Sequence, residues 1–452
     1  MTTEKTLTQP ELAPPPSGAG ARSTWIDHWD PEDATFWHDG GRRIARRNLY
    51  PSIFAEFLGF AVWASWSIVV PQLAAVGFVL TVDQQFWLIA IPSLVGATLR
   101  VPYTFAVPRF GGRNWTIISA LLLLLPASAL AFVVSRPGST PFWMLLAVAA
   151  LAGLGGGNFA SSMANISFFY PEAEKGKALG LNAAGGNLGT AAVQFAVPLV
   201  IVSAAGLQLA RAGLMFIPLI LLAAFLASRF MSNLTFAKAD YRAFGAAVHN
   251  RHTWIISFLY IGTFGSFIGY AGAFPTLLKT QFPEVTIAIA FLGALVGSLA
   301  RPVGGILADR WGGARVTIAG FAVMAVAASG AVMALRAGSF PLFLGSFLVL
   351  FVASGAGNGA TYRMIPAVFR FGATTADRAV KARKAAAGCI GIAGAVGALG
   401  GFLIPRGFAI SNSVAGSLQP ALWAFVGIYL VMGATTWAVY RRRGAPLSAA
   451  GI

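Results

Sequence analysis

Long apolar runs, separated by short polar segments, occupy most of the chain after residue 48. An α-helix rises 1.5 Å per residue, so about 20 apolar residues cross the hydrocarbon core of a bilayer. Twelve runs approach or exceed this length and predict twelve transmembrane helices. We place them near residues 51–76, 86–108, 115–135, 141–168, 178–203, 209–229, 253–278, 287–308, 315–335, 340–367, 384–408 and 418–440.

The composition agrees with this pattern. Of the 452 residues, 57% are hydrophobic and only 10% are charged, whereas a soluble domain carries about 25% charged residues. An outer-membrane barrel would show short segments of alternating hydrophobicity instead of long runs. The sequence therefore predicts an all-α polytopic membrane protein.

Lysine and arginine gather in alternate loops and in both tails. By the positive-inside rule, both termini then face the cytoplasm, and the net charge of +17 reflects topology and not nucleic-acid binding. The tail has no apolar segment typical of a cleaved signal peptide. Trp25–Trp37 carries enough Trp, His and Asp to dock on another surface, but we interpret it as a surface segment. The predicted divisions are a tail (1–48), a six-helix bundle (49–229), a central loop (230–252), a second bundle (253–440) and a C-terminal tail (441–452).

An internal repeat relates the two bundles. Leu94–Arg100 reads LVGATLR and Leu295–Arg301 reads LVGSLAR, at an offset of 201 residues. The same offset aligns Arg109–Gly112 with Arg310–Gly313. The chain therefore consists of two related, pseudo-symmetric halves, and each half carries one arginine inside a membrane helix.

These two arginines are the strongest candidates for function. Arg100 precedes the helix-end residue Arg109 by nine positions, which places it about 13 Å from that end. A charge at this depth costs about 2.5 kcal/mol or more. Glu56 is the only acid away from a helix end, and one acid cannot neutralise both Arg100 and Arg301. A bound anion is the favoured counter-charge, with a purely structural role as the alternative, and a planar oxyanion suits the guanidinium fork.

Polar and aromatic residues in nearby helices extend the candidate site. Three amides lie inside apolar helices and each needs a partner there; they are Asn158, Asn187 and Asn358, of which we prefer Asn187 as an anion ligand. Tyr260 and Phe264 lie one helical turn apart on one face, and Phe159 follows a glycine-rich stretch. A tyrosine hydroxyl can donate to an anion, and two phenyl faces can enclose a flat ion.

Glycines are concentrated in four of the predicted helices. Small residues let membrane helices approach closely, and we assign this packing role, together with gating, to Gly156, Gly186, Gly391 and Gly394. Gly153–Gly157 follows no strand, so it does not indicate a dinucleotide site.

No constellation predicts an enzyme. The four histidines lie in the tail and the central loop, and Cys389 is the only cysteine. His249 and His252 have a spacing that can clamp a metal, but a solvated loop is the commoner explanation. We predict no catalytic residues, no metal and no cofactor.

Several motifs point to a known family. Gly155–Pro171 reads GGGNFASSMANISFFYP and is followed by Lys175–Asn182 and Gly186–Gly189, while Tyr260–Gly269 reads YIGTFGSFIG. The first set resembles the nitrate signature of the nitrate/nitrite porter family, within the major facilitator superfamily. The similarity extends over nearly the whole chain after residue 25, although the helix 5 motif often has glycine where this chain has Ala183 and Ala184.

The resemblance implies a major facilitator fold and transport of nitrate and nitrite. It implies that Arg100 and Arg301 bind the ion, that Phe159 and Phe264 enclose it, and that Tyr260 and Asn187 donate hydrogen bonds. Gly391 would line the gate. The implied partners are nitrate, nitrite and membrane lipid, for a monomer in the cytoplasmic membrane.

For the mechanism, we expect nitrate/nitrite exchange by alternating access. Two buried cations without a resident acid resist crossing empty, since each charge pair is worth about 4 kcal/mol at 4 Å and an effective dielectric of 20. The alternative is proton-coupled nitrate symport, for which Glu56 is the candidate proton site. An anion receptor that signals through its tail, and a channel, are further readings of the same charge pattern.

Overall fold

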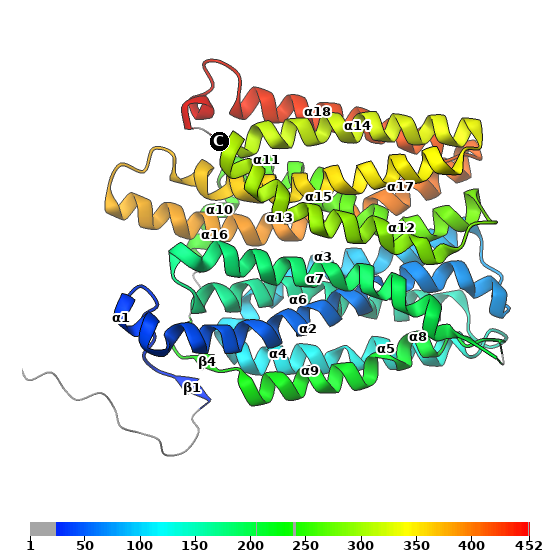
Figure 1. Ribbon diagram of the computed structural model, residues 1–452, viewed down its shortest axis with the longest axis horizontal. Coiled ribbons are helices and arrows are strands. Elements are labelled where there is room, and N and C mark those ends of the chain that lie inside the picture. The colour runs from blue at the N-terminus through cyan, green and yellow to red at the C-terminus, as the bar shows by residue number, and fades with distance from the viewer. Residues whose placement is uncertain (1–23, 205, 238–240, 451) are drawn as a thin grey trace, which may run out of the picture.

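The computed structural model describes residues 24–204, 206–237, 241–450 and 452. Within these residues, twelve helical segments are long and apolar enough to span a membrane. They lie side by side along the long axis of the molecule (Figure 1). Each overlaps one of the runs that the sequence marks, so the twelve predicted helices are confirmed.

Some spans are single helices and others are interrupted. In the first half the elements are α1 (Ala34–Phe36), η1 (Trp37–Gly41), α2 (Arg42–Val69), η2 (Val70–Val76), α3 (Val82–Phe110), α4 (Gly112–Leu122), α5 (Leu124–Val134), α6 (Phe142–Phe169), α7 (Glu172–Ile201), α8 (Arg211–Leu214) and α9 (Phe216–Phe230). In the second half they are α10 (Tyr241–Val248), α11 (Arg251–Tyr260), η3 (Ile261–Gly265), α12 (Ser266–Gln281), η4 (Ile287–Ala290), α13 (Phe291–Trp311), α14 (Gly313–Ala337), α15 (Phe340–Arg370), α16 (Ala376–Ala398), α17 (Gly400–Ala415), α18 (Gln419–Tyr440) and η5 (Pro446–Ala450). Two short strand pairs complete the described elements: β1 (Trp25–Ile26) with β4 (Asn233–Leu234), and β2 (Val202–Ser203) with β3 (Gly206–Leu207).

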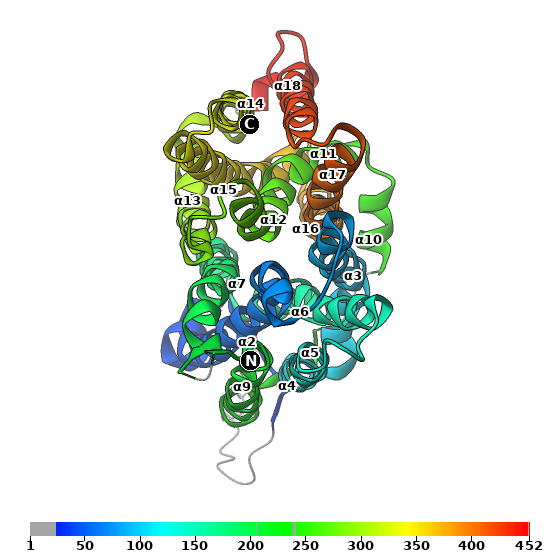
Figure 2. The ribbon, with the colours of Figure 1, turned by 90° about the vertical axis from the view of Figure 1, so that its right-hand side faces the viewer.

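The two halves form two helix groups that meet along one interface (Figure 2). At this interface α3 packs against α16 and α17, and α7 packs against α13. The helices that carry Arg100 and Arg301 therefore both belong to the contact between halves. We call the end of the bundle where α2 begins and α18 ends the terminal end (Figure 1).

The first helix begins earlier than the hydrophobic pattern predicts. Helix α2 starts at Arg42, whereas the pattern places its start near residue 51. The added turns are amphipathic: Ala45 and Leu49 are buried, whereas Arg43 and Arg46 are exposed. A count of apolar residues misses such a segment because only one of its faces is apolar.

The segment Trp25–Trp37, which we call the N-terminal strap, packs against the first bundle. Its strand β1 pairs in parallel with β4, which follows the sixth membrane span. Trp29 and Trp37 are only 7% and 4% exposed and contact Phe169 and Tyr170, at the junction of α6 and α7, edge to face. The interpretation of this segment as a surface segment is therefore wrong for Trp29 and Trp37, because their burial stabilises a docked conformation.

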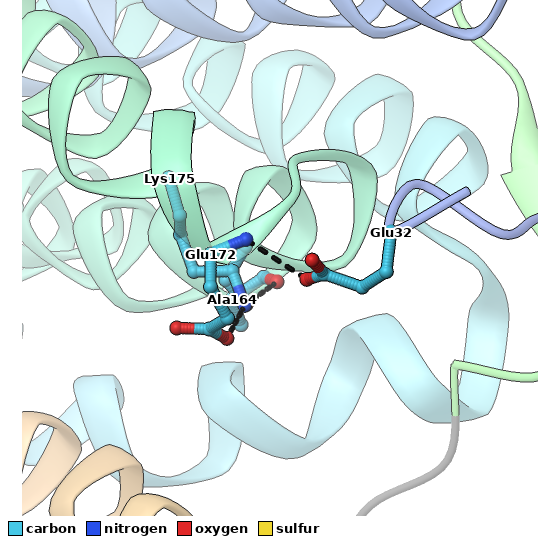
Figure 3. A network of polar contacts seen from close by, with 5 residues as sticks. Glu32, Ala164, Glu172 and Lys175 are labelled. Carbon is cyan, nitrogen blue, oxygen red and sulfur yellow. Dashed lines mark hydrogen bonds and ion pairs between the residues drawn. The ribbon is translucent and has the colours of Figure 1, made fainter. Parts of the chain in front are cut away.

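Polar contacts from the strap hold the first turn of α7. The side chain of Glu32 accepts a hydrogen bond of 2.9 Å from the backbone N–H of Glu172, which also forms an ion pair with Lys175 (Figure 3). The indole of Trp37 donates to Glu174 over 3.1 Å. A carboxylate at a helix N-terminus satisfies a free N–H and complements the helix dipole. The strap thus fixes the start of the helix that carries Gly186 and Asn187.

We expect replacement of Trp37 by alanine to destabilise the first bundle by about 3 kcal/mol, because removal of a buried indole leaves a cavity. Thermal unfolding of the purified protein in detergent measures the effect. Trp143→Ala is the matched control, since Trp143 is 65% exposed. Equal melting temperatures for the two variants would contradict a docked strap.

Candidate functional site

Arg100 connects the two halves through backbone carbonyl groups. Its side chain is 1% exposed; Nε donates to the carbonyl oxygen of Gly156 over 3.1 Å, and Nη1 donates to that of Gly394 over 2.6 Å. Gly156 lies on α6 and Gly394 on α16, so the two acceptors belong to opposite halves. Among the described residues, Nη2 of Arg100 has no hydrogen-bond partner. The sequence analysis assigns both glycines to packing and gating. In the structure the backbone carbonyl of each also accepts a hydrogen bond from Arg100.

Arg301 approaches the same place from α13. It is 7% exposed, and its Nη1 is buried without a hydrogen-bond partner in the described part of the chain. Its Cζ lies 5.7 Å from the ring centre of Phe159, while Cζ of Arg100 lies 4.6 Å from that centre. The two arginines of the repeat therefore converge on one aromatic ring at the interface between the halves.

Phe159 and Phe264 lie together beside Arg100, as expected, but their rings stack directly on each other. The rings of Phe159 and Phe264 are stacked with centres 6.2 Å apart and planes inclined by 25°, and Cζ of Arg100 lies 5.0 Å from the centre of Phe264. A flat ion between two rings needs about 7 Å, which is two van der Waals contacts. Enclosure of a flat ion between the two rings therefore requires that they separate.

Helix α11 ends at Tyr260, and the π-helical turn η3 (Ile261–Gly265) follows and carries Phe264. Such turns are rare and are frequent at functional sites. The Tyr260 ring stacks on Phe264 with centres 5.3 Å apart. Its hydroxyl donates a hydrogen bond to Oδ1 of Asn358 over 2.7 Å. The donor that the sequence analysis assigned to the anion is therefore paired with a protein group in this structure.

The two amides Asn358 and Asn187 differ in their surroundings. Asn358 accepts from Tyr260, and its buried Nδ2 group has no hydrogen-bond partner among the described residues. Asn187 on α7 is 1% exposed, and none of the described contacts joins it to Arg100 or Arg301. Asn358 is therefore tied directly to the aromatic cluster, whereas Asn187 remains a predicted ligand.

Sequence reasoning missed Tyr362. Its ring centre lies 5.8 Å from Cζ of Arg301 and 5.9 Å from the Tyr260 ring centre, and its buried hydroxyl has no partner among the described residues. Tyr362 follows Asn358 by four residues on α15, and this spacing places both side chains on one helix face. That spacing is the signal from which Tyr362 was predictable.

Glu56 lies in a buried polar network in the first half. The carboxylate is 1% exposed, and its Oε2 accepts from Nδ2 of Asn182 over 2.6 Å. The same amide group donates to Oγ of Ser162, which lies 2.9 Å from Oγ of Ser52. A Cβ at Gly186 would overlap Oε1 of Glu56. Gly186 therefore makes room for the carboxylate, and no sequence pattern marked the asparagine and the two serines around it.

The arginines and Glu56 attract one another. Both Arg100 and Arg301 act electrostatically on the carboxylate, although the described residues contain no ion pair within 4.0 Å between them. The expectation that the arginines have no acid near them is therefore modified: one carboxyl group, Glu56, interacts with both, and one carboxyl group cannot neutralise two cations.

The helix face of α16 that carries Gly391 and Gly394 is turned toward α3. A Cβ at Gly394 would lie 3.8 Å from Nη1 of Arg100, and one at Gly391 would lie 4.0 Å from Oγ1 of Thr104. Side chains at these positions would enter the space around Arg100. Away from the terminal end, the halves are also joined by an ion pair of 2.8 Å between Asp83 on α3 and Arg406 on α17.

The described residues contain no group of three or more His, Cys, Asp or Glu side chains arranged to hold a metal ion. Two buried cations, aromatic rings and amide groups together favour a small anion as ligand. The site has no nucleophile paired with a base in the contacts described above.

The sequence model of the Major Facilitator Superfamily matches residues 53–405. The nitrate/nitrite transporter NarU of Salmonella typhimurium is 40% identical over 446 residues, covering 92% of this chain and 96% of that protein. The chain belongs to the nitrate/nitrite porter family of the major facilitator superfamily. A further relative of this porter is the probable nitrate/nitrite antiporter NarK2 of Thermus thermophilus, which is 35% identical and covers 94% of this chain and 98% of its own length.

Solved structures agree with the fold. A D-xylose-proton symporter superposes with a TM-score of 0.66 at 17% identity, covering 86% of the porter and 97% of the symporter. A bacterial homologue of the human lysosomal transporter Spinster, inward-facing and unoccupied, gives a TM-score of 0.65 at 15% identity, covering 87% and 96%. These similarities show the fold. The family is one of membrane transporters, so the porter is a transporter and not an enzyme.

Proposed function

We propose that this porter carries nitrate and nitrite across the cytoplasmic membrane by alternating access, as an exchanger that holds the anion between Arg100 and Arg301. The observation that carries the proposal is the convergence of two buried arginines from opposite halves on Phe159, each with a guanidinium nitrogen that lacks a partner among the described residues. The printed names of NarU and NarK2 support the choice of nitrate and nitrite.

The chemistry of the site suits a small planar oxyanion. Guanidinium groups donate parallel hydrogen bonds to such ions and do not lose their charge near neutral pH. Burial strengthens each charge-assisted bond because little water competes for it. The faces of Phe159 and Phe264 keep water from the arginines, while Nδ2 of Asn358 and the hydroxyl of Tyr362 are further donors nearby.

Exchange follows from the charge that must cross the membrane. With Glu56 protonated, the empty site holds two uncompensated cations, whereas the loaded site holds one net positive charge. Each charge pair at 4 Å is worth about 4 kcal/mol at an effective dielectric of 20. The loaded porter therefore reorients more readily, so inward movement of nitrate is tied to outward movement of nitrite, the product of nitrate reduction.

Reconstitution into vesicles tests this function. We expect internal nitrite to accelerate uptake of labelled nitrate, and uptake to saturate with external nitrate. Uptake that neither saturates nor responds to an internal anion would overturn the carrier in favour of a channel. Binding of nitrate without flux would overturn it in favour of a receptor.

We also propose that both termini face the cytoplasm and that the porter works as a monomer surrounded by lipid. The cationic residues Arg42, Arg43, Arg46 and Arg47 and the run Arg441–Arg443 lie at the terminal end, as the positive-inside rule requires of the cytoplasmic side. The binding elements come from the two halves of one chain, so a second copy is not needed. Protease protection of a C-terminal tag in right-side-out vesicles tests the orientation.

A further inference from the structure

A second cationic site lies at the terminal end, away from the two membrane arginines. There a cavity of about 430 Å³ opens between the start of α11, the end of α18 and the segment that follows α18. Among the described residues that line it, three are arginines (Arg251, Arg442 and Arg443) and none is acidic. The two helices meet where Nδ1 of His252 lies 3.3 Å from the hydroxyl oxygen of Tyr440. We call this cavity the basic pocket, and its volume lies in the range of small-ligand sites.

A turn after α18 forms one wall of the basic pocket. The chain leaves the helix as a loop and folds back beside it (Figure 1). Gly444 has a φ of 87°, in the left-handed region that glycine adopts without steric cost. Beyond the turn, Leu447 of η5 is only 5% exposed. Burial of Leu447 anchors the returning segment, and Arg442 and Arg443, just before the turn, are thereby kept at the pocket.

The positive charge of the basic pocket has no partner within the protein. Within the part of the chain that the structure describes, the side chains of its three arginines form no hydrogen bond or ion pair. Other arginines on the same side of the molecule do have acidic partners, since Arg42 pairs with Glu174 and Arg363 with Asp309. Three like charges around one cavity repel one another, and a bound anion relieves that repulsion.

The basic pocket is apolar on its deeper side. Ile255 on α11 and Val439 on α18 line it about one helical turn farther from the terminal end than the arginines. Trp254 and Trp437, on the same two helices, are 51% and 53% exposed. Exposed tryptophans are enriched where a membrane protein meets the lipid headgroups. The pocket therefore has a cationic mouth at headgroup level and an aliphatic base at the level where acyl chains begin.

We propose that the basic pocket binds the headgroup phosphate of an anionic phospholipid, such as phosphatidylglycerol. Arginine donates paired hydrogen bonds to phosphate, and basic pockets between membrane helices suit anionic headgroups. A free phosphate ion would satisfy the arginines but leave the aliphatic base unfilled, so the lipid fits both parts. A phosphatidylcholine headgroup would bring a second cation to the arginines. The proposal goes beyond anion exchange and does not depend on which ion the porter carries.

Lipid titration of the detergent-extracted full chain, followed by native mass spectrometry, tests the proposal. We expect the wild type to hold one phosphatidylglycerol at least about tenfold more tightly than phosphatidylcholine. Neutralising the pocket should weaken phosphatidylglycerol binding by about tenfold or more, the factor for loss of one hydrogen bond to a charged group. The variant combines Arg251→Gln, Arg442→Gln and Arg443→Gln.

A control variant removes the same charge outside the basic pocket. Arg229, Arg310 and Arg315 are exposed at the ends of other helices on the same side of the molecule. Combined replacement of these three by glutamine should leave phosphatidylglycerol binding at the wild-type affinity. An equal loss in both triple variants would overturn the proposal, because it would show general attraction to positive charge and no defined site.

Thermal unfolding of the wild type gives a measurement that does not depend on how a variant folds. A ligand that binds only the folded state raises the melting temperature. We expect phosphatidylglycerol to raise it more than phosphatidylcholine or inorganic phosphate does. An equal rise with phosphatidylcholine would overturn the proposed selectivity for an anionic headgroup. An equal rise with inorganic phosphate would overturn the lipid as occupant in favour of a free phosphate ion.

Discussion

Replacement of Arg301 by lysine is expected to reduce both the apparent affinity for nitrate and the exchange rate. The ratio of the maximal exchange rate to the half-saturating nitrate concentration should fall by about a hundredfold. Lysine keeps the charge but loses the planar fork, so it cannot give an oxyanion two parallel hydrogen bonds. A hydrogen bond to a charged group is worth about 1.5–3 kcal/mol, and the larger value corresponds to this loss. Initial rates of nitrate uptake against internal nitrite, over a range of nitrate concentrations, measure the change.

Arg100→Lys should show a loss at least as large. This residue also donates to the carbonyl oxygens of Gly156 and Gly394, so its replacement frees two acceptors that belong to opposite halves. Arg310→Lys is a suitable control, because Arg310 is exposed at the end of the same helix as Arg301. Near-normal exchange in either membrane-arginine variant would show that the anion binds elsewhere.

Substitution of Gly355 is expected to cause a large loss of folded protein. A Cβ at this position would overlap the carbonyl oxygen of Gly297, at the contact between α15 and α13. Backbone cannot retreat as a flexible side chain can, and overpacking of a tight core costs about 1–3 kcal/mol, occasionally more. We therefore expect Gly355→Val to abolish the monodisperse peak of detergent-extracted protein in size-exclusion chromatography.

The chain offers a control in the same helix and a counterpart in the other half. A Cβ at Gly345 on α15 would meet no other atom within 4 Å, so Gly345→Val should be extracted like the wild type. An offset of 200 residues aligns the glycine-rich stretch of α6 with that of α15 and Gly155 with Gly355. A Cβ at Gly155 would overlap the carbonyl oxygen of Gly59. Normal extraction of both Gly155→Val and Gly355→Val would contradict the close helix contacts.

The fold was largely predictable because each membrane helix can be recognised from its own segment of sequence, as an apolar run of sufficient length. The least accurate boundary was the first helix, where Arg43 and Arg46 interrupt the run although Ala45 and Leu49 are buried. The buried side of such a segment depends on its neighbours, which a local pattern does not contain. The docking of Trp29 and Trp37 was only an alternative to a surface segment for the same reason.

The candidate site was predictable as a set of residues but not as a set of contacts. The repeat identifies Arg100 and Arg301, and the buried position of each follows from the length of its helix. The carbonyl oxygens that hold Arg100 have no signature in the sequence, because every residue has one and only helix approach selects those of Gly156 and Gly394. The sequence likewise has no signature for the hydrogen bond that the Tyr260 hydroxyl donates to Asn358.

Taken by itself, the sequence determined the twelve membrane helices, the duplication into two halves and the presence of two buried arginines with too few acids to neutralise them. Hydropathy and charge count decide these features, and both are properties of local composition. Only the tertiary structure decided that Arg100 and Arg301 meet over Phe159 and that Glu56 lies within their electrostatic reach. The physical reason is that charge balance in a low-dielectric site depends on distances between helices, which are fixed by packing and not by any one segment.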